Sequence, residues 1–344
     1  MNRSSFFLLL GVLLFVSPQF LFLQSFASSP ALAVTNLATG QTEPSNLFVY
    51  QGYVYWNSYN NFPIDRVPIA GGSVSPVLAT CNSPASQCVL SFVVNGNYVY
   101  YNNASGIYRV SVTGGASKLI VACLCLANFR IFSSSIYYVQ FTQNSRGADK
   151  STSINKVSIN GGPSTVLYKV PSGINIVEIA IYKSYIYWFD HLTGIGRVPL
   201  TGGAGKILYS SSTCVNDLWY TQSPMIIANG FIYLAISCGT GMAFPNSSGV
   251  YKISINGGAL TTLFTASGGA GSGNVVPDLT YNSGNILFSY TVIFGGGYGI
   301  YSVPSTGGSA TLLVSSNQPV SIVVSSGKAY YTDWTSGDVN TFTP

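Results

Sequence analysis

The sequence predicts an all-β fold, a seven-bladed β-propeller with four-stranded antiparallel blades, and three observations support this. Aromatic residues make up 14% of the 344 residues and charged residues only 7%, with 37 glycines, a composition that favours strands joined by tight turns. A strand-like phrase such as YVYW or YIYW occurs seven times, and six of its copies are followed by a phrase ending in Gly-Gly. Each repeat holds four short strands in about 45 residues, the size of one propeller blade. No segment has helical periodicity.

The N-terminal 33 residues are expected to form a segment of their own. Arg3 precedes an apolar run over residues 6–26, and small residues follow, a pattern typical of a secretory signal that is cleaved between residues 27 and 33. The apolar run is also long enough to span a bilayer as a retained anchor, although Pro18 interrupts it. We therefore expect residues 34–344 to form one exported domain, secreted or at the cell surface, with no transmembrane span after cleavage.

The first strand of each repeat carries apolar residues two positions apart, which places them on one face of an extended segment. One of these positions lies eight residues before a reference residue in the second strand, and it is apolar in every repeat: Leu47, Phe92, Phe129, Ile179, Met225, Leu279 and Ile322. The reference residues are Tyr55, Tyr100, Tyr137, Tyr187, Tyr233, Leu287 and Tyr330. Turn residues such as Asn95-Gly96 join the two strands into a hairpin.

The third strand ends at the double glycine, and a short fourth strand follows it in six repeats. The seventh repeat ends at Pro344 without a fourth strand. The segment AVTNLATG, at residues 33–40, carries the missing pattern, with Leu37 matching Leu78 and Leu313. We therefore expect the N-terminal strand to complete the seventh blade, which closes the ring and covers its open edge.

Two copies of the second-strand phrase carry an acidic residue. YYTDW includes Asp333 and Trp334, and YWFD ends at Asp190. These copies resemble the YWTD propeller repeats of the low-density-lipoprotein receptor family, and the resemblance covers residues 33–344. It implies extracellular binding, with Asp190, Asp333 and Trp334 as candidate binding residues.

The two faces of the predicted disc differ in their connections. On one face, the plain face, strand one joins strand two and strand three joins strand four, by turns that we expect to be two or three residues long. The loop-rich face carries all other connections, with long segments at residues 139–153, 235–248, 265–277 and 289–299. Loops on a rigid scaffold commonly carry recognition, so we expect a protein or glycan to bind there. Trp219, Tyr220 and Trp334 are the exposed aromatic candidates.

One mostly polar position recurs where each first strand enters the central channel. It is occupied by Asn46, Ser91, Asn128, Glu178, Pro224, Asp278 and Ser321. Such a ring could bind a cation or sugar hydroxyls, or it could only hydrate the channel end. We expect Arg130 to pair with Glu178 or to bind an anionic ligand. No metal spacing or phosphate loop occurs, so no cofactor is expected.

Asp190 and the single histidine, His191, form the best candidate acid–base pair. Adjacent residues at a strand end point in opposite directions, so we interpret Asp190 as a structural turn residue and do not expect an enzyme. The alternative is a lactonase- or lyase-like enzyme with Glu178, Asp278 and His191 around a metal. A second alternative is a structural unit of a surface layer or filament.

All six cysteines fall on the loop-rich side, and an exported chain favours disulfides. We expect the pairs Cys81–Cys88 and Cys214–Cys238, with Cys123–Cys125 as a strained or reduced pair. Asn103 and Asn246 are candidate glycosylation acceptors.

The net charge of +5 arises largely from one third-strand position. Its basic residues are Arg66, Arg109, Lys156, Arg197 and Lys252. We expect them to lie over neighbouring aromatic rings, one in each blade. A charge in each blade forms no stripe for a phosphate backbone, so nucleic acid is not an expected partner. The low charge content would suit an acidic medium, where carboxylates are neutral.

Overall fold

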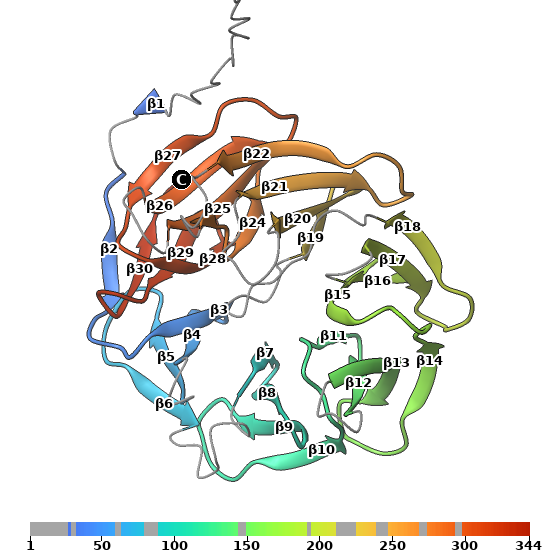
Figure 1. Ribbon diagram of the computed structural model, residues 1–344. Helices are drawn as coiled ribbons and strands as arrows, with labels where there is room; N and C mark the ends of the chain where they lie inside the picture. The colour runs from blue at the N-terminus through green and yellow to red at the C-terminus, as the bar shows by residue number, and fades with distance from the viewer. Residues whose placement is uncertain are drawn as a thin grey trace, which may run out of the picture.

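Seven blades, each built on four antiparallel strands, surround a central axis (Figure 1), which confirms the predicted seven-bladed propeller. The computed structural model describes residues 27–28, 32–58, 63–78, 89–143, 149–190, 194–210, 225–238, 247–267, 274–292 and 298–344. Within these ranges, no helix is long and apolar enough to cross a membrane. Residues 1–26 of the predicted leader lie outside the described residues.

The blades follow one another in chain order. Blade 1 contains β3 (Pro44–Tyr50), β4 (Tyr53–Ser58), β5 (Ile64–Pro68) and β6 (Ser75–Leu78). Blade 2 contains β7 (Ser91–Asn95), β8 (Tyr98–Asn103), β9 (Gly106–Ser111) and β10 (Lys118–Ala122). Blade 3 contains β11 (Arg130–Phe132), β12 (Ser135–Gln143), β13 (Asp149–Ser158) and β14 (Thr165–Lys169). Blade 4 contains β15 (Ile176–Tyr182), β16 (Tyr185–Asp190), β17 (Gly194–Pro199) and β18 (Lys206–Ser210). Blade 5 contains β19 (Met225–Ala228), β20 (Phe231–Cys238), β21 (Ser247–Ser254) and β22 (Thr261–Ser267).

Blades 6 and 7 include the elements near the two ends of the chain. Blade 6 contains β24 (Leu279–Asn282), β25 (Asn285–Val292), β26 (Gly299–Pro304) and β27 (Thr311–Ser315), with β23 (Asn274–Val275) beside β25 and β1 (Ala27–Ser28) parallel to β27. Blade 7 contains β28 (Pro319–Ser325), β29 (Lys328–Asp333), β30 (Asp338–Phe342) and β2 (Thr35–Ala38). The first strand of each blade lies nearest the axis (Figure 1).

The ring closes through β2, as predicted. Thr35 pairs with Thr341 and Asn36 pairs with Asn340 in an antiparallel ladder. The buried side chains of Leu37 and Ala38 then pack in one cluster with Trp56 of blade 1. The closing strand therefore belongs to the sheet of blade 7 and also to the core between blades 7 and 1.

A β-bulge recurs in the ladder between strands three and four of every blade. The residues skipped by the pairing are Leu37, Val77, Ile120, Leu167, Leu208, Leu263 and Leu313. A bulge re-aims the extra side chain, and here all of these residues except the half-buried Leu313 are buried. The predicted match of Leu37 with Leu78 is therefore wrong by one residue, because Val77 is the equivalent position.

The turns on the plain face are uniform, but only half of them have the predicted length. Every turn from strand one to strand two has two residues, as at Ser326 and Gly327, whose φ angles of 49° and 76° are those of a tight hairpin. Every connection from strand three to strand four has six residues, not two or three, as at residues 69–74. The double glycine turns the chain with φ angles of 83° and 133° at Gly71 and Gly72, and further residues follow before the fourth strand pairs.

The third-strand cations lie over aromatic rings, as predicted. Arg66, Arg109 and Arg197 lie 4.4, 4.5 and 4.4 Å from the ring centroids of Tyr53, Tyr98 and Tyr185, and Lys156 and Lys252 lie over Tyr137 and Phe231. Several also bond to the next blade. Arg197 Nη1 donates to the Ile255 carbonyl at 2.9 Å, and Lys252 Nζ donates to the Ser305 carbonyl at 2.7 Å. These contacts tie neighbouring blades together on the plain face.

Candidate functional site

The predicted polar ring lies at the start of the first strands, on the loop-rich side of the channel. The side chains of three of its members accept hydrogen bonds from backbone N–H groups of the next blade. Asn128 Oδ1 accepts from the Ile179 N–H at 3.0 Å, Asp278 Oδ2 accepts from the Ile322 N–H at 3.0 Å, and Ser321 Oγ accepts from the Asn46 N–H at 2.9 Å. These side chains therefore hold the innermost strands in register around the channel.

Glu178 is buried in this ring and pairs with Arg130, as predicted. Arg130 Nη2 lies 2.6 Å from Glu178 Oε1, and Arg130 Nη1 donates to the Phe129 carbonyl at 3.0 Å. Only 2% of Glu178 is exposed. Burial raises the pKa of Glu178 to about 7, although the charge of Arg130 and hydrogen bonds from Asn128 and Arg130 oppose the shift.

Asp278 is the second buried carboxyl of the ring. Its oxygens accept from the Leu279 N–H at 2.8 Å and from the Ile322 N–H. Burial raises its pKa to about 7, with a smaller contribution from the charge of Glu178. Each of the two carboxyls can therefore take up or release a proton near neutral pH. Among the described residues, no three His, Cys, Asp or Glu side chains converge as a metal site would require.

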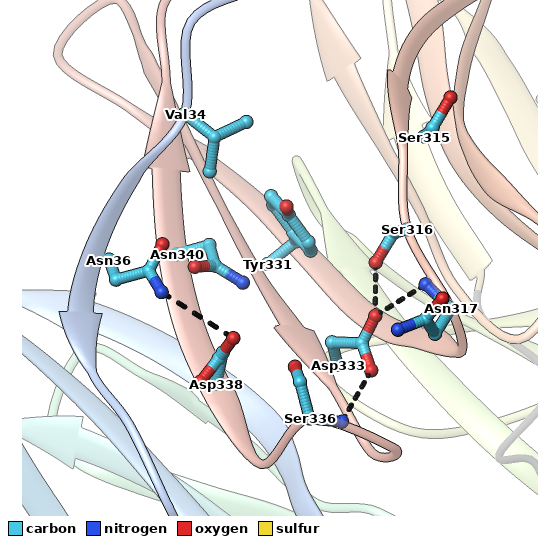
Figure 2. Close-up of a pocket in the computed structure, with 10 residues that line it drawn as sticks. All are labelled: Val34, Asn36, Ser315, Ser316, Asn317, Tyr331, Asp333, Ser336, Asp338 and Asn340. Carbon is cyan, nitrogen blue, oxygen red and sulfur yellow. Dashed lines mark hydrogen bonds between the residues drawn. The ribbon is translucent and has the colours of Figure 1, made fainter.

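A second site lies between blades 6 and 7, where a pocket of about 300 Å³ opens on the loop-rich half (Figure 2). It is bounded by β2, β29 and β30 on one side and by the link that follows β27 on the other. Its lining residues are Val34, Asn36, Ser315, Ser316, Asn317, Tyr331, Asp333, Ser336, Asp338 and Asn340. The lining holds no basic side chain, and all but one of these residues are polar or tyrosine.

Asp333 builds one wall of this pocket. Its Oδ2 accepts from the Ser316 hydroxyl, from the Asn317 N–H at 2.7 Å and from the Gln318 N–H at 3.1 Å, while its Oδ1 accepts from the Ser336 N–H at 3.1 Å. Figure 2 shows three of these bonds. Burial alone would raise the pKa of Asp333, but these hydrogen bonds lower it. Asp333 is therefore an ionised brace between the link and the turn.

Asn340 lines the pocket and carries a buried side-chain oxygen that has no hydrogen-bond donor among the described residues. The residue is 3% exposed, and this oxygen is Oδ1. The equivalent Asn155 of blade 3 donates to Ser153 Oγ at 2.9 Å. Around Asn340, Asn36 donates weakly to Asp338 at 3.5 Å, and Tyr331 keeps its hydroxyl proton because burial raises its pKa to about 12. The pocket thus offers donors and acceptors without a net positive charge.

The structure does not bring the predicted residues into one site. Arg130, Glu178 and Asp278 belong to the channel mouth, whereas Asp333 lies in blade 7 and Trp334 is half-buried next to it. Asp190 is buried at the end of β16, where its backbone pairs with Gly194, a position that suits a structural residue.

Other predicted residues lie outside the described residues. These are His191, Trp219, Tyr220, Asn246, Cys81, Cys88 and Cys214. The backbone of Cys238 ends β20, but its side chain is also outside the description. Cys123 and Cys125 are joined by a disulfide in the link between blades 2 and 3. The predicted pair is therefore oxidised.

The pocket residues Asn36, Tyr331 and Asn340 were not predicted from the sequence. Asn36 and Asn340 are 304 positions apart and become neighbours only when β2 pairs with β30. The sequence signal was present in the predicted ring closure, because a register for the two strands would have placed one asparagine opposite the other.

Comparison with known proteins supports the fold. No protein-family model matches the chain, and no curated protein matches it. The extracellular domain of BT4673 from B. thetaiotaomicron is similar with 9% identity and a TM-score of 0.62, over 91% of this chain and 39% of that chain. The Neurospora crassa Pan2 WD40 domain is similar with 9% identity and a TM-score of 0.60, over 92% of this chain and 98% of that chain. YCF48 bound to D1 peptide is similar with 11% identity and a TM-score of 0.59, over 93% of this chain and 99% of that chain.

These identities show a shared β-propeller fold and nothing finer. The class defined by fold and site is therefore a seven-bladed propeller with a polar pocket on its loop-rich half. The YWTD resemblance stays an interpretation of the motifs at Asp190 and Asp333, because no family match supports that repeat type.

Proposed function

We propose that the protein is an exported propeller, secreted or at the cell surface, that binds a protein or glycan through its loop-rich face. The contrast between the two faces carries this proposal. On the plain face, every connection has two or six residues. On the loop-rich face, the connections between strands vary in length, from the short connection at residues 104–105 to the long one at residues 211–224. Variable loops on a repeated scaffold are the usual place for recognition.

The pocket between blades 6 and 7 favours a hydroxyl-rich ligand within that class. Sugar hydroxyls both donate and accept hydrogen bonds, and the pocket offers both partners through Asn340, Asn36 and the Tyr331 hydroxyl. The free Asn340 Oδ1 would gain the donor that it lacks, and leaving such a buried acceptor unpaired is costly. A neutral glycan fits this lining better than an acidic one, because Asp338 would repel a carboxylate.

Two structural neighbours are consistent with this proposal. One is an extracellular domain, and another was solved with a bound peptide. Their similarity to this chain is one of fold, so they support a binding role only by analogy.

The test is a screen of glycans and extracellular protein domains, with variants of the pocket. We expect Asn340→Ala to weaken the captured ligand at least about tenfold, since a desolvated hydrogen bond contributes about 1 to 3 kcal/mol. Asn155→Ala is the matched control, because it changes the equivalent residue of blade 3 and should leave binding unchanged. Absence of any ligand in the screen, or a ligand that the unaltered protein and the Asn340→Ala variant bind equally, would refute the pocket as the recognition site.

A lactonase- or lyase-like enzyme is the second candidate, favoured by the two buried carboxyls with pKa values of about 7 at the channel mouth. Metal analysis of the purified protein and lactone hydrolysis assays test it. A protein without a divalent ion and without hydrolysis would count against this candidate. A surface-layer or filament role predicts self-association in sedimentation at high concentration.

A further inference from the structure

The charges of the propeller are separated between its two faces. Nine basic residues lie in the strand halves or turns that meet the plain face: Arg66, Arg109, Lys118, Lys156, Lys183, Arg197, Lys206, Lys252 and Lys328. The Asp and Glu residues of the described chain lie at strand ends or links of the loop-rich face: Glu43, Asp65, Asp149, Glu178, Asp190, Asp278, Asp333 and Asp338. The plain face therefore has basic side chains and, within the described ranges, no Asp or Glu residue.

The exposed apolar side chains gather on the same face. Eight large hydrophobic residues are exposed among the described residues: Val34, Ile69, Tyr98, Leu119, Phe132, Val166, Ile207 and Phe231. All of them except Val34, which lines the pocket between blades 6 and 7, lie at the first or last residues of a strand where it meets the plain face, or directly beside that end. Leu119, Val166 and Ile207 stand at one repeated position of the outer strands β10, β14 and β18, which follow one another around the rim (Figure 1).

The cations and the apolar residues are in direct proximity. Lys118 precedes Leu119 on β10, and Lys206 precedes Ile207 on β18; all four side chains are exposed. Arg109 lies 4.5 Å from the ring centroid of Tyr98, and Lys252 lies 5.2 Å from that of Phe231. Apolar side chains that enter the acyl boundary, beside cations that contact lipid phosphates, are typical of surfaces that bind anionic bilayers.

A polyanion explains this surface less well than a lipid bilayer does. A soluble acidic polysaccharide would engage the cations and could stack on Tyr98, but the aliphatic side chains of Leu119, Val166 and Ile207 offer it nothing. In a bilayer interface the same aliphatic side chains leave water. Ala27 pairs with Thr311, the first residue of β27, and so lies at the plain face.

We propose that the plain face is a docking surface for a bilayer that contains anionic lipids. Docked in this way, the propeller presents its loop-rich face away from the membrane. This inference does not depend on the ligand of the loop-rich face, and it would hold for a processed chain as well as for an anchored one.

The test is co-sedimentation with vesicles of phosphatidylcholine alone or of phosphatidylcholine with phosphatidylserine. Residues 32–344 are suitable because they contain all four strands of each blade, including the closing strand β2. We expect binding to the anionic vesicles that weakens with added salt, and much weaker binding to the neutral vesicles. Lys118→Glu/Lys206→Glu should lower the anionic-vesicle affinity at least about tenfold, because two attractive charges become repulsive.

The matched control is Lys150→Glu/Lys169→Glu, which makes the same change in net charge with two exposed lysines of the loop-rich half. We expect it to change the affinity by no more than about twofold. Leu119→Ser/Ile207→Ser should also weaken vesicle binding, while leaving binding to the sulfated polysaccharide heparin unchanged. A melting curve of each variant should be measured to check that it is folded.

Three outcomes would overturn the proposal. They are no sedimentation of the wild-type propeller with anionic vesicles, equal losses in the two lysine double variants, and heparin binding without vesicle binding. The last outcome would assign the face to a soluble polyanion.

Discussion

At the scale of single residues, Glu178 and Asp278 make stability depend on pH in an unusual direction. Their pKa values rise to about 7 in the folded chain from ordinary values of 4.5 and 3.8. Between pH values of about 4 and 7 the folded state therefore binds more protons than the unfolded state. The free energy of unfolding should fall as the pH rises through this window.

We predict that the protein is more stable at pH 5 than at pH 7.5, by about 3 kcal/mol or more. Chemical unfolding at several pH values measures this difference. Glu178→Gln should flatten the slope, because glutamine does not titrate. Equal stability at both pH values, or a slope that the variant leaves intact, would contradict the assignment. The predicted direction agrees with the interpretation that the low charge content suits an acidic medium.

The Arg130–Glu178 pair was predictable because Arg130 lies two residues beyond Asn128, which occupies the same ring position as Glu178 in the neighbouring blade. The role of Asn340 in the pocket was not predictable, because it depends on the missing hydrogen-bond partner of its side-chain oxygen and not on its residue type. A sequence shows which groups can form hydrogen bonds, but it does not show which of them remain unsatisfied after packing.

At the scale of elements, Asp333 holds two connections of blade 7 together. Its carboxylate accepts from the link that follows β27 and from the turn that precedes β30. Its pKa is lowered, so its contribution to stability is present at neutral pH and is lost as the pH falls below the ordinary range of an aspartate.

We predict that Asp333→Ala lowers the free energy of unfolding by about 2 to 4 kcal/mol at pH 7, because several backbone N–H groups lose a charged acceptor. Asp338→Ala is the control, since Asp338 accepts one weak bond at 3.5 Å from Asn36 and should cost less than about 1 kcal/mol. Urea unfolding of both variants provides the comparison. Similar losses in the two variants would remove Asp333 from its bracing role.

The elements themselves were predicted well because each strand is specified several times. Repetition makes a weak local pattern readable, as with the first-strand apolar position, where six of the seven residues are buried and only Leu47 is half-buried. The recurring bulge was missed because it shifts pairing by one residue without changing composition. Leu78 and Val77 are equally apolar, and only the ladder distinguishes them.

At the scale of the whole molecule, the strand order is the same in every blade, so all the blades present their short turns on one face and their long connections on the other. The β2–β30 ladder closes the ring between blade 7 and blade 1. The sequence predicted this closure because one repeat lacked a strand that the N-terminal segment supplied. It did not predict the separation of charge between the faces, because that pattern becomes visible only when residues are sorted by strand end and not by position in the chain.

The most direct test of the account is a covalent link between the two chain ends. Thr35→Cys/Thr341→Cys joins two residues that pair across β2 and β30, and neighbouring antiparallel strands bring such pairs within disulfide range. Peptide mapping by mass spectrometry should find a 35–341 disulfide under mild oxidation, and the linked protein should gain about 2 to 4 kcal/mol in unfolding free energy. Asn36→Cys/Thr341→Cys, in which the side chains point to opposite faces of the sheet, should not form it. Failure of the 35–341 bond to form, or equal linkage in the mismatched variant, would contradict a ring closed by the N-terminal strand.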